Sequence, residues 1–62
     1  MKIYLKKLRK ELNLSQNKFS AKADISLRYY QRIEAGECTP SLHILNKIAK
    51  ANNLSIHDLI DD

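Results

Sequence analysis

The sequence predicts an all-α protein, a compact bundle of five helices in a single domain that spans residues 1–62. Three observations lead to this fold class. The chain has 62 residues, 44% of them apolar, with one Gly and one Pro, a composition that suits a small helical bundle. β-Branched residues are few, since Ile occurs seven times, Thr once and Val not at all. Apolar residues recur at helical spacing, and Ser residues stand where helices would begin.

The first helix is expected over residues 3–12. Leu5, Leu8 and Leu12 recur at the spacing of one helical face and form its apolar stripe. The lysines between them face away from this stripe, where they are expected to be solvated. This helix is therefore expected to contribute mainly to the core.

Two short helices joined by a tight turn are expected over residues 15–23 and 26–35. Ser15 and Ser26 can each cap a helix by accepting a backbone N–H group. Asp24 tolerates the left-handed conformation that a sharp reversal often needs. Two capped helices with a short turn between them form a helix-turn-helix motif. The rest of the chain is expected to hold this motif in place.

Two further helices are expected after the motif, over residues 41–52 and 56–60. Gly36 can end the preceding helix in the left-handed conformation. Ser55 and Asp58 have the spacing of a helix start, with the acidic side chain favourably placed in the first turn. These signals complete the prediction of five helices.

The exposed face of the third expected helix carries residue types that recognise DNA bases. At about 100° per residue, one stripe of this helix carries Ala35 together with four larger side chains, Leu27, Arg28, Gln31 and Arg32. Arg forms paired contacts with guanine, and Gln with adenine, in the major groove. We interpret these four larger residues as candidate base contacts. The alternative for a basic helix is that its charged face is only solvated. The position of this helix as the second helix of the motif favours contact with DNA instead.

The charge distribution favours a polyanionic partner. Residues 1–32 hold nine Lys or Arg against two Asp or Glu, a charge of +7, whereas residues 33–62 hold two against five, a charge of −3. Such a polarised molecule can present one face to nucleic acid. A membrane partner is not expected, because no apolar run approaches about 18 residues and the N-terminus is too charged for a signal peptide. These features predict a cytoplasmic protein.

The sequence predicts neither an enzyme nor a metal or cofactor site. His43 and His57 have no Cys or His at ligand spacing. No Ser/His/Asp arrangement, carboxylate pair or Gly-rich phosphate loop is recognisable. Cys38 stands alone, which excludes an internal disulfide and fits a reducing compartment. We interpret it as an incidental loop thiol rather than a redox sensor.

The chain resembles the phage repressor and Cro-like helix-turn-helix family, often called XRE-type, from about Leu5 to Ile60. The resemblance rests on the joint spacing of Leu8-Arg9, Leu14-Ser15-Gln16, Phe19-Ser20, Ile25-Ser26, Ile33-Glu34-Ala35-Gly36, Pro40-Ser41-Leu42, Ile48-Ala49-Lys50-Ala51, Leu54-Ser55 and Leu59-Ile60. It implies the lambda-repressor-like fold and a sequence-specific regulator of transcription, most often a repressor. The third helix would then enter the major groove of double-stranded DNA.

The resemblance also assigns roles outside the base-contacting face. Matching Arg and Glu residues of the family form a partly buried ion pair between the first and third helices, a role that we carry over to Arg9 and Glu34. The family's Gln at the start of the second helix contacts a phosphate and often braces a side chain of the recognition helix. The candidate phosphate contacts here are Gln16, Lys18, Ser26 and Tyr29. For Tyr29, packing against the second helix is the alternative.

A homodimer on a pseudo-palindromic site is expected, because one short recognition helix contacts only about four or five base pairs. Ile56, Leu59 and Ile60 are candidate dimer contacts, since the last segment is too short to hide them. Folding back onto the core is the alternative. The remaining functional alternatives are an antitoxin with a toxin as its partner, and a protein-interaction module on the same fold.

Overall fold

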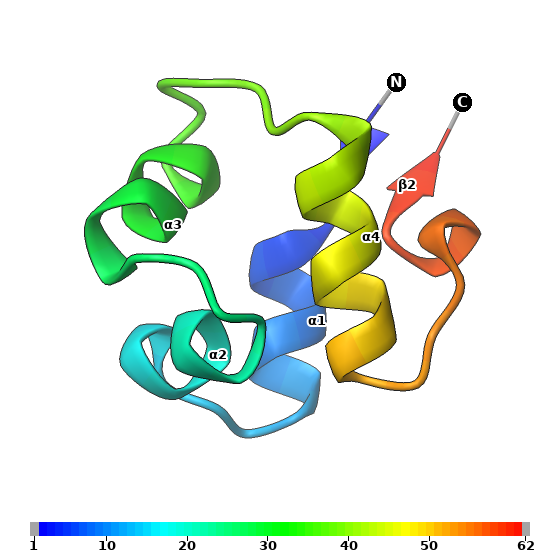
Figure 1. Ribbon diagram of the computed structural model, residues 1–62, viewed down its shortest axis with the longest axis horizontal. Coiled ribbons are helices and arrows are strands. Elements are labelled where there is room, and N and C mark those ends of the chain that lie inside the picture. Colours follow the sequence, from blue (N-terminus) through cyan, green and yellow to red (C-terminus); the bar gives the residue numbers. More distant parts are fainter. Residues whose placement is uncertain (1, 62) are drawn as a thin grey trace.

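The computed structural model describes residues 2–61, which contain four α-helices, a 3-10 helix and two short strands. The α-helices are α1 (Leu5–Glu11), α2 (Gln16–Lys22), α3 (Leu27–Glu34) and α4 (Leu42–Ala51). The 3-10 helix η1 (Ile56–Asp58) and the strands β1 (Lys2–Ile3) and β2 (Ile60–Asp61) complete the order. Figure 1 shows α2 and α3 together at one side of the molecule, with the chain ends near each other beside α4.

Serine side chains cap the N-termini of three helices. The hydroxyls of Ser15, Ser26 and Ser41 accept the backbone N–H groups three residues later, at 3.1, 3.1 and 3.2 Å. Each cap satisfies one of the N–H groups that have no partner within the helix. The starts of α2, α3 and α4 therefore agree with the expected ones to within a residue.

Left-handed residues follow the ends of all four α-helices. They are Asn13, Asp24, Gly36 and Asn53, with φ values of 59°, 57°, 79° and 56°. Asn and Asp are the side-chain-bearing residues that tolerate this region best, and Gly enters it without a steric penalty. The tight turn between α2 and α3 is thus made at Asp24, as the sequence predicted.

One apolar core joins all four α-helices. Its buried members are Leu5, Phe19, Ala23, Tyr30, Ile33, Leu45, Ile48, Ala49 and Leu59. The rings of Phe19 and Tyr30 pack with centroids 5.2 Å apart, so they join α2 to α3 at the centre of the motif. Leu12 was expected on the buried stripe but is 40% exposed, because α1 ends one residue before it.

The prediction of a fifth helix over residues 56–60 is wrong. Only Ile56–Asp58 are helical, as a single 3-10 turn. The Asp58 carboxylate accepts hydrogen bonds from the backbone N–H and the hydroxyl of Ser55, at 3.0 and 3.2 Å. Five residues are too few to close a stable α-helix, and this tight turn satisfies the polar groups of the segment instead.

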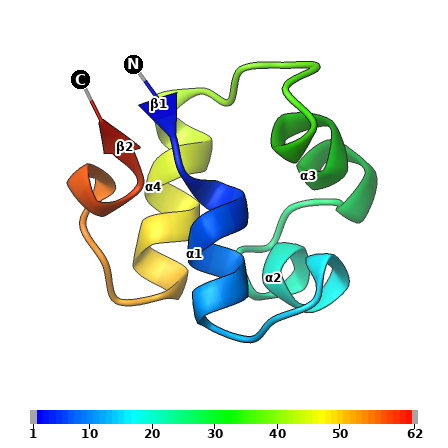
Figure 2. The same ribbon diagram turned by 180° about the vertical axis from the view of Figure 1, so that it is seen from behind.

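The chain then pairs with its own beginning. Ile60 lies opposite Ile3 in an antiparallel pair of strands, and the Tyr4 N–H donates to the Leu59 carbonyl at 2.8 Å. Figure 2 shows β1 and β2 side by side. Because Ile3 belongs to this pair, the first helix begins at Leu5 instead of residue 3.

Of the three candidate dimer contacts, the structure buries one and leaves two partly exposed. Leu59 has 0% of its side chain exposed and belongs to the core, so it presents no surface to a second copy. Folding back onto the core, the alternative stated for this residue, is what the structure shows. Ile56 and Ile60 remain partly exposed, although both pack against the core.

Candidate nucleic-acid interface

Ser20 is a small polar residue of α2 that is buried beside the turn into α3. Ser20 is 1% exposed, and its hydroxyl donates to the Asn17 carbonyl at 3.0 Å. The hydrogen bond within α2 leaves the buried hydroxyl with a partner. The Ile25 N–H also donates to the Ser20 carbonyl at 3.0 Å, which fixes the turn into α3.

The structure places the four candidate base contacts on the exposed face of α3. Leu27, Arg28, Gln31 and Arg32 are all exposed, while Tyr30 and Ile33 point into the core. The buried side anchors the helix, so the exposed side is presented in a defined orientation. An amphipathic helix of this kind can place its polar stripe against a ligand without losing its core contacts.

The four candidate phosphate contacts lie around the N-termini of α2 and α3. Lys18 and Ser26 are exposed, whereas Gln16 and Tyr29 are partly buried. The Ser26 hydroxyl accepts the Tyr29 N–H as a cap, which leaves its own O–H group able to donate to a phosphate. Tyr29 packs against the core.

An ion pair between Arg9 and Glu34 connects α1 to the end of α3. The Arg9 Nε and Nη2 atoms donate to the two oxygens of the Glu34 carboxylate at 3.0 and 2.9 Å. Arg9 Nη1 donates in addition to the Leu14 carbonyl at 2.9 Å. The two side chains are only 13% and 7% exposed. This bidentate geometry fixes the distance and the angle between the helices.

The pair keeps both of its members charged. Burial by itself would raise the pKa of the Glu34 carboxyl, but the hydrogen bonds from Arg9 and Gln16 outweigh it and hold this pKa below its ordinary value. The hydrogen bond to Glu34 raises the pKa of the Arg9 guanidinium in turn. Glu34 is therefore an ionised carboxylate at neutral pH.

Two glutamines extend this pair towards the exposed face of α3. Gln16 Nε2 donates to Glu34 Oε1 at 3.2 Å, and Gln31 Nε2 donates to Gln16 Oε1 at 3.2 Å. The family resemblance implied that Gln16 braces a side chain of the recognition helix but did not indicate which one. The structure shows that this side chain is Gln31.

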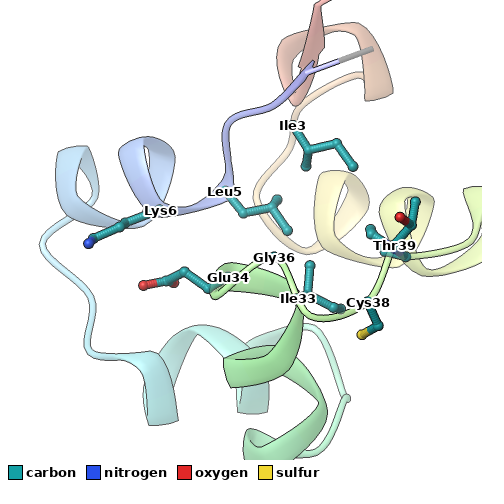
Figure 3. Close-up of a pocket in the computed structure, with 9 residues that line it drawn as sticks. Ile3, Leu5, Lys6, Ile33, Glu34, Gly36, Cys38 and Thr39 are labelled. Carbon is teal, nitrogen blue, oxygen red and sulfur yellow. The ribbon is translucent and has the colours of Figure 1, made fainter.

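A pocket of about 260 Å³ lies between the start of α1 and the loop that joins α3 to α4 (Figure 3). Its walls are formed by Ile3, Leu5, Lys6, Ile33, Glu34, Gly36, Cys38, Thr39 and Pro40. The Cys38 side chain is partly buried here. None of the four candidate base contacts lines the pocket, so it lies apart from the exposed face of α3.

Neither a metal cluster nor a membrane-spanning helix is found in the described part of the chain. Within residues 2–61, no three His, Cys, Asp or Glu side chains gather in a way that could hold a metal ion. None of the helices there combines the length and the apolar character that crossing a membrane requires.

Comparison with known proteins identifies the architecture. The sequence profile of the helix-turn-helix family matches residues 5–59, a stretch that includes all four α-helices. The chain belongs to this family. Its helix-turn-helix motif consists of α2, the turn at Asp24 and α3.

Two curated proteins are similar to nearly the whole chain. The control protein C.MunI from a Mycoplasma species is 42% identical over 59 residues, which cover 94% of this chain and 80% of that protein. The HTH-type transcriptional regulator DdrOP3 from Deinococcus deserti is 33% identical over 57 residues, which cover 92% of this chain and 44% of that protein. This chain therefore spans less than half the length of the second relative. No solved structure matches the chain significantly.

Tyr30 introduces a buried hydroxyl beside the ion pair. Its side chain is 0% exposed, and its hydroxyl makes no hydrogen bond of normal geometry within residues 2–61. It lies near enough to Arg9 and Glu34 to interact with them electrostatically. Burial is the main reason that the pKa of this hydroxyl is raised.

We expect Tyr30→Phe to leave the free energy of unfolding unchanged or to raise it by up to about 1 kcal/mol, because the buried hydroxyl has no hydrogen bond of normal geometry to lose. The folded chain also retains this proton at a pH where the unfolded chain loses it. Stability should therefore fall as pH rises above about 10, and it should fall less steeply in the variant. Urea unfolding of both proteins from pH 7 to 11 measures this. A loss of 1 kcal/mol or more at pH 7 would show that the hydroxyl is stabilising.

Proposed function

We propose that this chain is a sequence-specific regulator of transcription that binds double-stranded DNA with α3 in the major groove. The observation that carries the proposal is the exposed stripe of Leu27, Arg28, Gln31 and Arg32 on a helix whose opposite side is anchored in the core. Arg and Gln are the side chains best suited to paired contacts with guanine and adenine. Membership of the helix-turn-helix family supports this use of the face.

Contacts to phosphate would hold the helix in register. Lys18 and Ser26 lie near the N-termini of α2 and α3, and each can donate to a phosphate oxygen without recognising a base. The second N–H of Gln16 can do the same, because Glu34 takes only one of the two. The charge of +7 in residues 1–32 favours approach to DNA.

Such binding would act on transcription by occlusion. A protein seated in the major groove over a promoter blocks polymerase, so we propose a repressor that acts in the cytoplasm. The family match over residues 5–59 supports treating residues 1–62 as one DNA-binding domain.

Base contacts and phosphate contacts should differ in their response to mutation. Replacing Arg28 or Arg32 with Ala should relax the preference at a particular operator position by about 1–3 kcal/mol. Replacing Lys18 with Ala should weaken binding to all sequences alike and lower the salt slope by about one. The measurement is binding of each variant, at several salt concentrations, to a panel of single-base changes in an operator selected from random duplex DNA.

Lys50 provides a matched control, because it is an exposed basic residue at the end of α4. Lys50→Ala should change neither the base preferences nor the salt slope appreciably. If both Arg variants lose affinity uniformly and retain the wild-type preferences, these residues are electrostatic anchors and the assignment of the base-contacting face is wrong.

We further propose that the functional unit is a homodimer on a pseudo-palindromic site. A recognition helix of eight residues is short, and two copies with half-sites about 34–36 Å apart would double the contacted sequence. Ile56 and Ile60 remain the candidate contacts, as they are partly exposed. Sedimentation on operator DNA should give two protomers per site. One protomer per complete site would exclude the homodimer.

A further inference from the structure

We infer that Glu34 sets the base preference of Gln31 by fixing, through Gln16, which atoms of the Gln31 amide face DNA. The inference rests on the proposed function of α3 as the base-contacting helix. It gives Glu34, a partner in a buried ion pair, a second role as a positioning residue for recognition.

The contacts form a continuous chain from the interior to the exposed face. Glu34 Oε1 accepts from Gln16 Nε2, and Gln16 Oε1 accepts from Gln31 Nε2, both at 3.2 Å. We call these three residues the amide relay. It begins at a side chain that is 7% exposed and ends at one that is exposed on the base-contacting face. The relay therefore joins the ion pair directly to the proposed interface.

The direction of the hydrogen bonds in the relay follows from the charge on Glu34. Arg9 donates to both carboxylate oxygens, at 3.0 and 2.9 Å, and an ionised carboxylate can only accept. Gln16 must therefore turn its NH2 group towards Glu34, which leaves its oxygen for the next residue. Gln31 must in turn direct its own NH2 group at that oxygen. One acceptor-only group thus orients two amides in series.

This orientation determines what Gln31 presents to a base. Its Oε1 atom is left as an acceptor, and one N–H remains because a primary amide nitrogen carries two hydrogens. An acceptor beside a donor matches the amino group and N7 of adenine. A reversed amide would present N–H donors alone, which match the O6 and N7 acceptors of guanine. The relay therefore selects adenine and disfavours guanine.

The wild-type protein should favour adenine at one base pair of each half-site, and Gln31→Ala should identify that pair by abolishing the preference. Paired Gln contacts discriminate by about five- to 150-fold. Glu34→Gln supplies a group that can donate, so both amides can reverse. We expect its preference for adenine over guanine at this base pair to fall about two- to tenfold, the effect of one hydrogen bond. Gln16→Met, which removes the link at similar volume, should lower the preference by a similar factor.

Two control variants separate positioning from structural effects. Arg9→Lys weakens the ion pair but keeps Glu34 as an ionised acceptor, so it should lower stability and retain the adenine preference. Lys18→Met removes a charge near Gln16 on α2, and it should weaken binding to all sequences alike. Binding of all five variants and the wild type is measured on the four possible base pairs at that position, at a temperature where each protein is folded.

The relay can also be detected without DNA. The side-chain amide NMR signals of Gln31 should shift in Gln16→Met and stay in place in Lys18→Met. Unshifted signals in Gln16→Met would overturn the relay, as would an undiminished adenine preference in both Gln16→Met and Glu34→Gln. If the wild type binds all sequences equally, the proposed function itself fails. If it binds specifically but Gln31→Ala alters no preference, only the present inference fails.

Discussion

Replacing Glu34 with Ala is expected to lower the free energy of unfolding by about 3 kcal/mol. Arg9 would then stay largely buried, since the pair is 13% and 7% exposed, without the carboxylate that accepts two of its hydrogen bonds. An uncompensated buried charge costs far more than the intact pair contributes. Chemical denaturation followed by circular dichroism measures the loss.

Glu37→Ala is the matched control, because Glu37 is an exposed carboxylate just after α3. Its replacement should change stability by less than about 0.5 kcal/mol. The difference in the free energy of unfolding between wild type and Glu34→Ala should also shrink as pH falls below about 4.3. A carboxylate whose pKa is lowered by folding stabilises the fold fully only above its unfolded pKa, and it loses this contribution as it is protonated. An equal loss of unfolding free energy in Glu34→Ala and Glu37→Ala would mean that the Arg9–Glu34 ion pair makes no specific contribution to stability.

Leu59→Ala is expected to destabilise the isolated chain by about 2–4 kcal/mol, the usual cost of truncating a fully buried leucine. Leu59 is 0% exposed, whereas its backbone carbonyl, which accepts the Tyr4 N–H, is retained by Ala, so the expected loss comes from the packing of the side chain. The loss should be the same at every protein concentration, because the contacts lie within one chain.

Leu42→Ala serves as the comparison, because Leu42 is 64% exposed at the start of α4. It should change stability by less than about 0.5 kcal/mol. If Leu59→Ala instead left the melting temperature unchanged and weakened self-association, Leu59 would be an interface residue and the fold-back of the C-terminal segment would be wrong.

The helix-turn-helix motif could be predicted from the sequence because its signals are local. Ser15 and Ser26 act within three residues as caps, and Asp24 and Gly36 adopt left-handed conformations at the turns where they stand. Such signals depend on the residue and its neighbours, and distant contacts hardly alter them. The predicted bounds of the two helices therefore differ from the observed ones only at the caps.

The Arg9–Glu34 pair was expected from the family resemblance, and the structure contains it. The two are 25 positions apart, and no local pattern indicates that they meet. Likewise, the exposed stripe of α3 follows from helical geometry, whereas its link to the core through Gln16 does not.

Only the tertiary structure decided the conformation of the segment from Ser55 to Ile60. The sequence from Ser55 to Ile60 contains a helix start signal and apolar residues, which predicted a fifth helix with a candidate dimer surface. Pairing of Ile60 with Ile3 and burial of Leu59 replace that helix with one turn and a strand. The strand pair and the amide relay both depend on residues that become neighbours only after the core has formed. Sequence periodicity shows which face of a helix is buried, but it does not show which distant residues the core brings together.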